Sequence, residues 1–194
     1  MLTASTHRRT LLVLAAGATL QAAALPRQAA AAPADGGLSK LQVHAAPRPL
    51  PEGIAFADAE GQPMRFDAFR GRALVVNFWA TWCPPCVAEM PSLDRAHATL
   101  AAEGIEVLAL SSDRGGRAQV EPFYQRTGLR HLAILLDPRG AAGRALSVRG
   151  LPTTLVLDRQ GREVARLEGE AAWDHPDIIA AVRRLAGPRA NDAA

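Results

Sequence analysis

Cys83 and Cys86 are the only cysteines in the chain, and two prolines separate them in the segment FWATWCPPCVAEMP, residues 78–91. A disulfide between them would close a very small ring and add little stability, because a disulfide stabilises mainly by closing a long loop. A tetrahedral metal site would need further ligands, commonly a second cysteine pair or histidines. The nearest downstream histidine, His97, lies 11 residues beyond Cys86. We therefore expect no bound metal, although two thiolates could hold Cu(I) transiently.

Thiol–disulfide exchange fits this pair better. If a helix begins at the pair, Cys83 faces unpaired backbone N–H groups and the positive end of the helix dipole, which favour the thiolate. That thiolate would attack a disulfide of a partner, and Cys86, one turn away, would resolve the mixed disulfide. Pro84 and Pro85 suit a first helical turn, where a missing N–H costs little. These residues predict electron exchange but leave its direction open.

The segments around the pair alternate between the periods of strands and helices. The apolar run at 73–80 predicts a strand covered on both faces, and the cysteines follow it directly. In an α/β fold, active residues lie where the carboxyl end of a buried strand leads into a helix. We therefore expect a mixed central sheet flanked by helices. The expected strands are a short pair that turns at Glu60–Gly61, three strands at 73–80, 105–112 and 132–137, and a hairpin at 153–169. The expected helices run from the cysteines to near Gly104 and over 116–128, 140–148 and 176–187.

The N-terminus predicts export. Arg8 and Arg9 precede an apolar run and then small residues, so we interpret residues 1–32 as an export signal, of the twin-arginine or the general secretory type, or as an uncleaved membrane anchor. Residues 33–52 are rich in Pro, Gly and Ala and predict a flexible tether. We expect the folded domain over 53–188 and a tail at 189–194. The expected compartment is a bacterial-type periplasm, where nearby thiols are oxidised unless they are actively reduced.

Charge argues against a nucleic-acid partner. The net charge of +3 comes from residues 1–32, which carry Arg8, Arg9 and Arg27 and no acidic residue. Without those three arginines, 19 of the 22 basic residues remain, against 19 acidic ones. The part that we expect to fold is therefore neutral and lacks the excess of positive charge that nucleic-acid binding requires.

A resemblance adds to this interpretation. VNFWATWCPPCVAEMP, followed downstream by GLPTT and a late Trp173, is similar to the TlpA/ResA/DsbE-like thiol:disulfide oxidoreductases. The likeness runs from about Gly53 to Gly187, and Trp173 with Arg114 makes it greatest to the TlpA group. It implies a single thioredoxin-like domain with an N-terminal strand extension and no cofactor.

The resemblance also implies roles for residues around the pair. Cys83 would be the nucleophile and Cys86 the resolving thiol of a redox-active Cys83–Cys86 disulfide. Glu89 would exchange a proton with Cys86, although an ordinary exposed helix glutamate is the alternative. Asn77 stands where thioredoxin has a buried aspartate, so proton handling would pass to Glu89 or water. Pro91 would kink the first helix, which is a structural role.

A second group of residues would contact the substrate. Pro152 matches the cis-proline that faces the disulfide in this fold, and Leu151 would offer its backbone to an extended substrate segment. Trp82 and Pro84 flank the nucleophile, and Trp82 would supply a flat apolar contact surface. Packing alone is the alternative for Trp82.

We therefore expect a periplasmic reductase of exported protein disulfides. The resemblance implies apocytochrome c or an oxidase assembly protein as the substrate and a DsbD- or CcdA-type membrane protein as the electron donor. Three alternatives remain open at this point: a copper chaperone that uses the two thiols, a peroxidase, and a general disulfide exchanger or oxidase. Contact with a membrane would occur only through an uncleaved N-terminal anchor.

Overall fold

The apolar run Ala73–Trp79 forms β4, and every residue of this strand is buried. In the computed structural model, which describes residues 34–189, β4 lies inside an eight-stranded sheet of order β1-β8-β7-β4-β5-β6-β2-β3. β4 pairs in parallel with β5 and antiparallel with β7. The sheet is therefore mixed, as expected. Its strands are Gln42–Pro49 (β1), Ala55–Ala57 (β2), Pro63–Arg65 (β3), Ala73–Trp79 (β4), Ile105–Ser111 (β5), Leu135–Leu136 (β6), Thr153–Leu157 (β7) and Arg162–Glu168 (β8).

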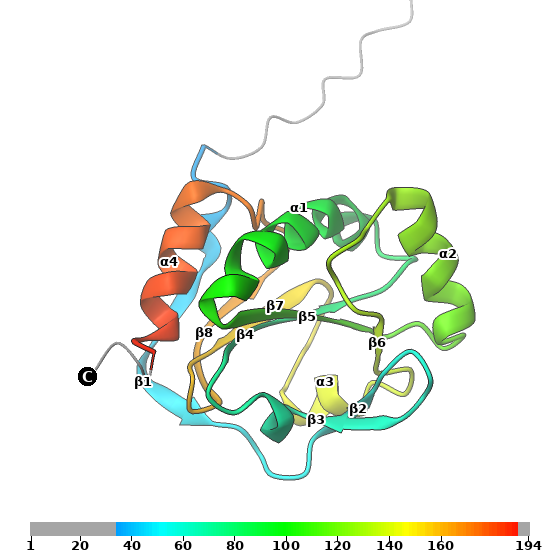
Figure 1. The fold of residues 1–194 in the computed structure, drawn as a ribbon, viewed down its shortest axis with the longest axis horizontal. Helices are drawn as coiled ribbons and strands as arrows, with labels where there is room; N and C mark the ends of the chain where they lie inside the picture. Colours follow the sequence, from blue (N-terminus) through cyan, green and yellow to red (C-terminus); the bar gives the residue numbers. More distant parts are fainter. Residues whose placement is uncertain (1–33, 190–194) are drawn as a thin grey trace, which may run out of the picture. The chain divides into compact units, whose positions relative to one another are not determined.

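Helices cover both faces of this sheet, because alternate residues of its strands point to opposite sides. Val75 and Trp79 of β4 pack under α1, α2 and α4, whereas Leu74, Val76 and Phe78 face α3 and the short helix η2. Figure 1 shows α1 and α2 on one side of the sheet and α3 on the other. The helices are Pro84–Leu100 (α1), Arg117–Thr127 (α2), Ala141–Ala145 (α3) and Pro176–Ala186 (α4), with short 3₁₀ turns at Leu38–Lys40 (η1), Phe66–Phe69 (η2) and Ala101–Glu103 (η3).

The predicted tether is wrong over Gln42–Pro49, which forms the edge strand β1 paired with β8. The sequence pattern did not indicate this strand, because nearly all of its side chains are exposed and apolar and polar residues therefore do not alternate along it. His44 is the exception: its ring lies 2.9 Å from the Glu163 carboxyl group. β1, β2 and β3 all precede β4, which gives the expected N-terminal strand extension.

Other boundaries differ in detail. Gly104 ends the first helical segment with a positive φ of 67°, as expected of a helix C-terminus. β6 is confined to Leu135–Leu136, shorter than the strand predicted over 132–137. His175 caps α4 by accepting from the Asp177 N–H. The predicted export signal and most of the predicted tail lie outside the described residues. Within residues 34–189, no helix has the length and apolar character needed to cross a membrane.

Candidate active site

Cys83 is the N-cap of α1, and Pro84 and Pro85 occupy the first helical turn. The two cysteines are joined by a disulfide with an S–S distance of 2.06 Å. Cys83 Sγ accepts from the Cys86 N–H at 3.4 Å. Since the two prolines have no N–H, Cys86 is the first residue of the helix able to donate to that sulfur. Cys83 is 5% exposed and Cys86 is fully buried, so the outer sulfur is the accessible one.

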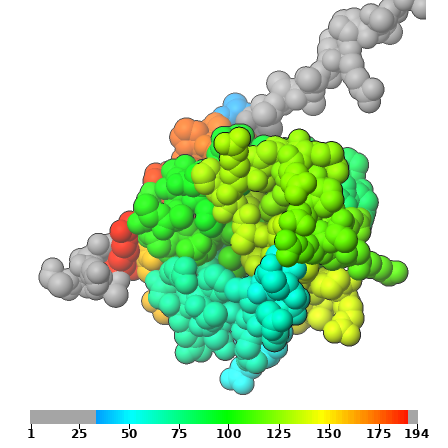
Figure 2. Space-filling view, turned by 45° about the vertical axis from the view of Figure 1, so that its right-hand side comes forward, coloured from blue at the N-terminus to red at the C-terminus, as the bar shows by residue number. Residues whose placement is uncertain are grey.

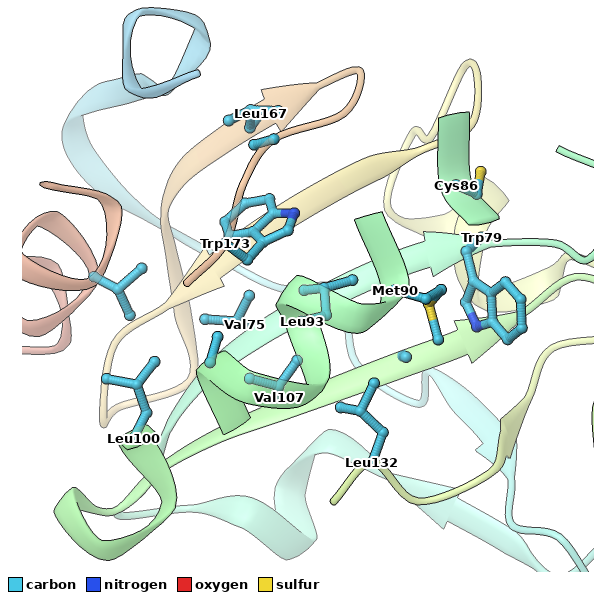
Figure 3. Packing of buried hydrophobic residues seen from close by; sticks show 14 of the residues in the cluster. Val75, Trp79, Cys86, Met90, Leu93, Leu100, Val107, Leu132, Leu167 and Trp173 are labelled. Atoms are coloured by element: carbon cyan, nitrogen blue, oxygen red, sulfur yellow. The ribbon is translucent and has the colours of Figure 1, made fainter. Parts of the chain in front are cut away.

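The pair lies at the carboxyl edge of the sheet, as expected. β4 ends at Trp79, and residues 80–82 connect it to Cys83. Figure 3 shows Cys86 and Trp79 at the end toward which β4 and β5 point, whereas Leu100 lies at the opposite end of α1. Trp79 packs against Phe123 of α2, with ring centroids 5.1 Å apart. The connection to Cys83 therefore starts from a rigid, buried anchor.

Asp113, which follows β5, holds this connection in place. Its fully buried carboxyl group accepts from the Thr81 N–H at 2.9 Å and from the Thr81 hydroxyl at 2.8 Å. Ser111 and Gln119 donate to the same carboxyl group. Gly116 N–H bonds to the Asp113 carbonyl, so 113–116 form a turn. Asp113 thus fixes the residue that precedes Trp82 and Cys83.

Glu89 lies beneath the pair on the buried face of α1 and is only 3% exposed, which excludes the alternative of an exposed helix glutamate. Three N–H donors surround its carboxyl group: Asn77 Nδ2 at 2.8 Å, the Ala171 backbone at 3.1 Å and Trp173 Nε1 at 2.9 Å. Figure 3 shows Trp173 beside the buried face of α1. Parts of the chain more than 80 residues apart therefore meet at this carboxyl group.

Burial raises the pKa of Glu89 from an ordinary 4.5 to about 7. Loss of solvent disfavours the charged form, and the donors from Trp173, Ala171 and Asn77 offset only part of that cost. A carboxyl group with a pKa near neutral pH can both accept and return a proton, as a general acid–base group must. Its place one turn after Cys86 on the same helix suits exchange of a proton with that thiol.

Asn77 in β4 is fully buried and connects Glu89 to the neighbouring strand. Its side-chain N–H₂ group donates to Glu89 and, at 2.9 Å, to the Thr154 hydroxyl. Its side-chain oxygen has no partner among the described residues. Asn77 therefore orients Glu89 but cannot itself titrate.

Leu151 and Pro152 lie beside the pair at the start of β7. The Leu151–Pro152 peptide bond is cis, as expected. Thr153 directly opposes Phe78 of β4, which brings the start of β7 to the edge where β4 ends. Within the described residues, the backbone of Leu151 makes no hydrogen bond, so its N–H and C=O are free to pair with a substrate segment.

Trp82 is 64% exposed beside the almost buried Cys83. A large aromatic side chain in solvent contributes little to the core, so its exposure favours a contact role over packing. Pro84 is exposed as well. Pro91 lies inside α1, five residues after Cys86.

Sequence analysis missed two parts of the site. Trp173 had been singled out only as a mark of resemblance, yet it donates to Glu89. Asp113 was not singled out, although an acidic residue directly after a buried parallel strand lies where functional groups gather. Among residues 34–189, no cluster of three or more His, Cys, Asp or Glu side chains could hold a metal.

The fold and the site define a thioredoxin-like protein with a disulfide between the cysteines of a CxxC motif. The model of the Redoxin family matches residues 40–182. The chain therefore belongs to the Redoxin family, and within it the similarities are to TlpA/ResA/DsbE-like proteins.

Among curated proteins, the chain is 34% identical over 109 residues to the thiol-disulfide oxidoreductase ResA of Geobacillus thermodenitrificans, covering 56% of this chain and 62% of that protein. It is 31% identical over 113 residues to ResA of Bacillus thuringiensis subsp. konkukian, covering 58% of this chain and 64% of that protein. The matches thus span less than two thirds of the length of these relatives.

Among solved structures, a putative thiol:disulfide interchange protein DsbE from Chlorobium tepidum matches with a TM-score of 0.64 at 23% identity, covering 73% of this chain and 97% of the other. A secreted thiol-disulfide isomerase from Corynebacterium glutamicum matches with a TM-score of 0.62 at 25% identity, covering 74% and 91%. Both confirm the thioredoxin-like fold.

Proposed function

We propose that this protein is a thiol:disulfide oxidoreductase that reduces disulfides of exported proteins. The observation that carries the proposal is the Cys83–Cys86 disulfide at the N-terminus of α1, with Glu89 buried one turn beyond it. Similarity to ResA proteins supports the same activity. Because the disulfide closes so short a loop, stability gives no reason for its presence.

The reaction proceeds in two exchanges. The Cys83 thiolate attacks one sulfur of the substrate disulfide, forms a mixed disulfide and releases the other substrate sulfur as a thiolate. The Cys86 thiolate then attacks Cys83 Sγ, which forms the Cys83–Cys86 disulfide and releases the second substrate thiolate. Two electrons pass from the protein to the substrate, and a dithiol donor must return two electrons before the next cycle.

Glu89 handles the proton of Cys86. A buried thiol is a poor nucleophile until it loses its proton, and the ionised Glu89 carboxylate accepts that proton as Cys86 attacks. When the donor reduces the disulfide, the protonated carboxyl group returns it. A pKa of about 7 suits both directions at neutral pH. Asn77, Ala171 and Trp173 hold the carboxyl group in place throughout.

The cellular setting follows from the N-terminal sequence and the relatives. The arginine pair and apolar run of residues 1–32 favour export to a periplasm, and one structural neighbour is a secreted protein. In that compartment a reductase needs a membrane-linked electron donor of the DsbD or CcdA type. The resemblance to the TlpA group favours apocytochrome c or a copper-site assembly protein of a respiratory oxidase as the substrate.

Substitution of each cysteine tests the activity. The purified protein should reduce a protein disulfide, and Cys83→Ser should abolish this reduction. Cys86→Ala should accumulate a mixed disulfide at Cys83, and isolating that species would identify the substrate. Turnover that persists in Cys83→Ser would contradict the mechanism. A reduction potential as oxidising as about −120 mV would contradict the reductase direction.

A further inference from the structure

A groove opens at Trp82, the residue before Cys83, and its loops follow β4, β5 and β6, which lie on the side of the sheet away from Leu151 and β7. It is lined by residues of three loops, Trp82 after β4, Ser112 and Arg114 after β5, and Pro138, Arg139 and Gly140 after β6, and its volume is about 890 Å³. β4, β5 and β6 are consecutive and parallel. Their carboxyl ends therefore meet at the same edge of the sheet as the cysteine pair. The groove is open and can accept several residues of an extended chain rather than enclosing a small molecule.

Unpaired positive charge borders this groove. Arg114 and Arg139 are exposed, and within residues 34–189 neither guanidinium group makes an ion pair or hydrogen bond. Arg144 adds a third cation, because its guanidinium group donates to the Arg139 carbonyl at 2.6 Å and lies beside Gly140. A guanidinium group binds carboxylates through paired hydrogen bonds.

Neighbouring groups do not cancel this charge at the surface. Asp113 and Asp137 adjoin the lining residues in sequence, but both carboxyl groups are buried. Asp113 accepts from Thr81, and Asp137 accepts from the backbone of α3 at Ala142 and Gly143.

Arg117, which lies outside the groove, does form ion pairs. Its guanidinium group pairs with Glu121 and with Glu60 of the β2–β3 turn. Figure 2 shows α2, in yellow-green, above the segment that holds β2 and β3, in cyan and blue-green. Among residues 34–189, Arg114 and Arg139 have no such acidic partner, so they remain available to a bound molecule.

The two sides of Cys83 therefore differ. On the Leu151 side, exposed Arg149 and Glu168 carry opposite charges, and the free backbone of Leu151 offers pairing that does not depend on sequence. On the groove side, Trp82 offers a flat apolar surface, and the arginines offer positive charge. Because β5 and β6 lie on the opposite side of β4 from β7, a segment that pairs with Leu151 and extends across Cys83 runs toward Trp82 and the groove.

We infer that this groove binds an acidic segment next to the substrate disulfide, so that Asp or Glu side chains near the target cysteine select the substrate. The inference rests on the proposed function, since it names the substrate class of the same site. Charge complementarity of this kind acts mainly on the rate of association and on the choice of partner.

Matched peptides test the inference. Each peptide carries a single cysteine in a mixed disulfide with 2-mercaptoethanol, flanked on both sides by two glutamates, two serines or two lysines. The rate at which the reduced full chain reacts with each peptide is measured at low and high salt. We expect the acidic peptide to react about tenfold faster than the lysine peptide at low salt, with a smaller ratio at high salt.

Two double variants test whether the preference for the acidic peptide depends on the arginines of the groove. R114Q/R139Q should bring the ratio of acidic to lysine rates to about two or less, whereas R48Q/R126Q, which removes the same charge from exposed arginines elsewhere, should keep the ratio. Equal rates for the three peptides with the unaltered chain would overturn the inference. A ratio that persists in R114Q/R139Q, or that falls equally in both variants, would overturn it as well.

A binding measurement separates this inference from the proposed function. Peptides with serine in place of cysteine cannot exchange, and their titration into the oxidised full chain is followed at the indole N–H resonance of Trp82 by NMR. The acidic peptide should shift this resonance, and the lysine peptide should not. Equal shifts, or no shift with either peptide, would overturn the groove assignment. Failure of all cysteine peptides and of hydroxyethyl disulfide to react would instead overturn the proposed function.

Discussion

Glu89 and Asp113 are both buried acidic residues beside the cysteine pair, yet their surroundings differ in kind. Asp113 accepts from two groups of Thr81 and from Ser111 and Gln119, so its partners lie in the connection from β4 to α1, at the end of β5 and in the first turn of α2. Glu89 accepts from three N–H groups of the interior, and burial still raises its pKa to about 7.

The difference separates a positioning role from a chemical one. The hydrogen bonds of Asp113 fix the backbone at Thr81, from which Trp82 and Cys83 follow. The hydrogen bonds of Glu89 hold a carboxyl group one helical turn from Cys86, and the pKa of this group is near neutral pH. Similar burial therefore serves the geometry of the nucleophile Cys83 in one case and, in the proposed mechanism, proton transfer at Cys86 in the other. Substitutions at the two positions should affect different measurements.

The largest effect is expected from Asp113→Ala. This change leaves the buried Ser111 hydroxyl and the part-buried N–H and hydroxyl of Thr81 without their carboxylate acceptor, and it should lower the free energy of unfolding by about 3 kcal/mol. Urea denaturation measures the loss. Glu121→Ala, which removes an exposed carboxyl group paired with Arg117, should cost far less, because an exposed ion pair contributes little to stability. Equal losses in the two variants would remove the positioning role of Asp113.

Glu89→Gln should act on the chemistry instead. The rate of disulfide exchange should fall about a hundredfold at neutral pH, and the inflection near pH 7 in its pH profile should disappear. Glu52→Gln, at an exposed position remote from α1, is the matched control. A profile that keeps its inflection in Glu89→Gln would show that another group handles the proton.

The pH dependence of the free energy of unfolding is a second measurement that Glu89→Gln should change. Folding raises the pKa of Glu89 from 4.5 to about 7, so the folded state binds more protons between these pH values. The free energy of unfolding should therefore decrease as the pH rises from about 4.5 to about 7. Glu89→Gln should remove this part of the pH dependence, measured by urea denaturation across that range.

The smallest effect is expected from Trp173→Phe. Its Nε1–H stabilises the ionised form of Glu89, so its loss should raise the pKa of Glu89 further and move the inflection of the rate profile upward by roughly one pH unit. Trp79→Phe is the matched control, because the indole N–H of Trp79 is buried without a partner among the described residues. An equal shift in both variants would contradict a specific role for Trp173.

The redox pair and its place in the fold could be predicted because they depend on neighbours in the chain. Apolar residues run up to Trp79, Cys83 starts a helix with two prolines in its first turn, and Gly104 ends that segment. Each of these signals acts within a few residues. β1 lacked such a signal: its exposed, proline-containing sequence has no alternation, and pairing with β8, more than 110 residues away, makes it a strand.

By itself, the sequence determined that two cysteines at the start of a helix exchange disulfides, since the spacing and the helix terminus set that chemistry locally. Only the tertiary structure decided that Glu89 is buried against Trp173 and Ala171 and that Asp113 fixes Thr81. It also decided that Arg114 and Arg139 line one groove with no acidic partner in the part of the chain that the structure describes. The physical reason is that desolvation and charge pairing depend on which distant residues fold into contact, and no local pattern records those contacts.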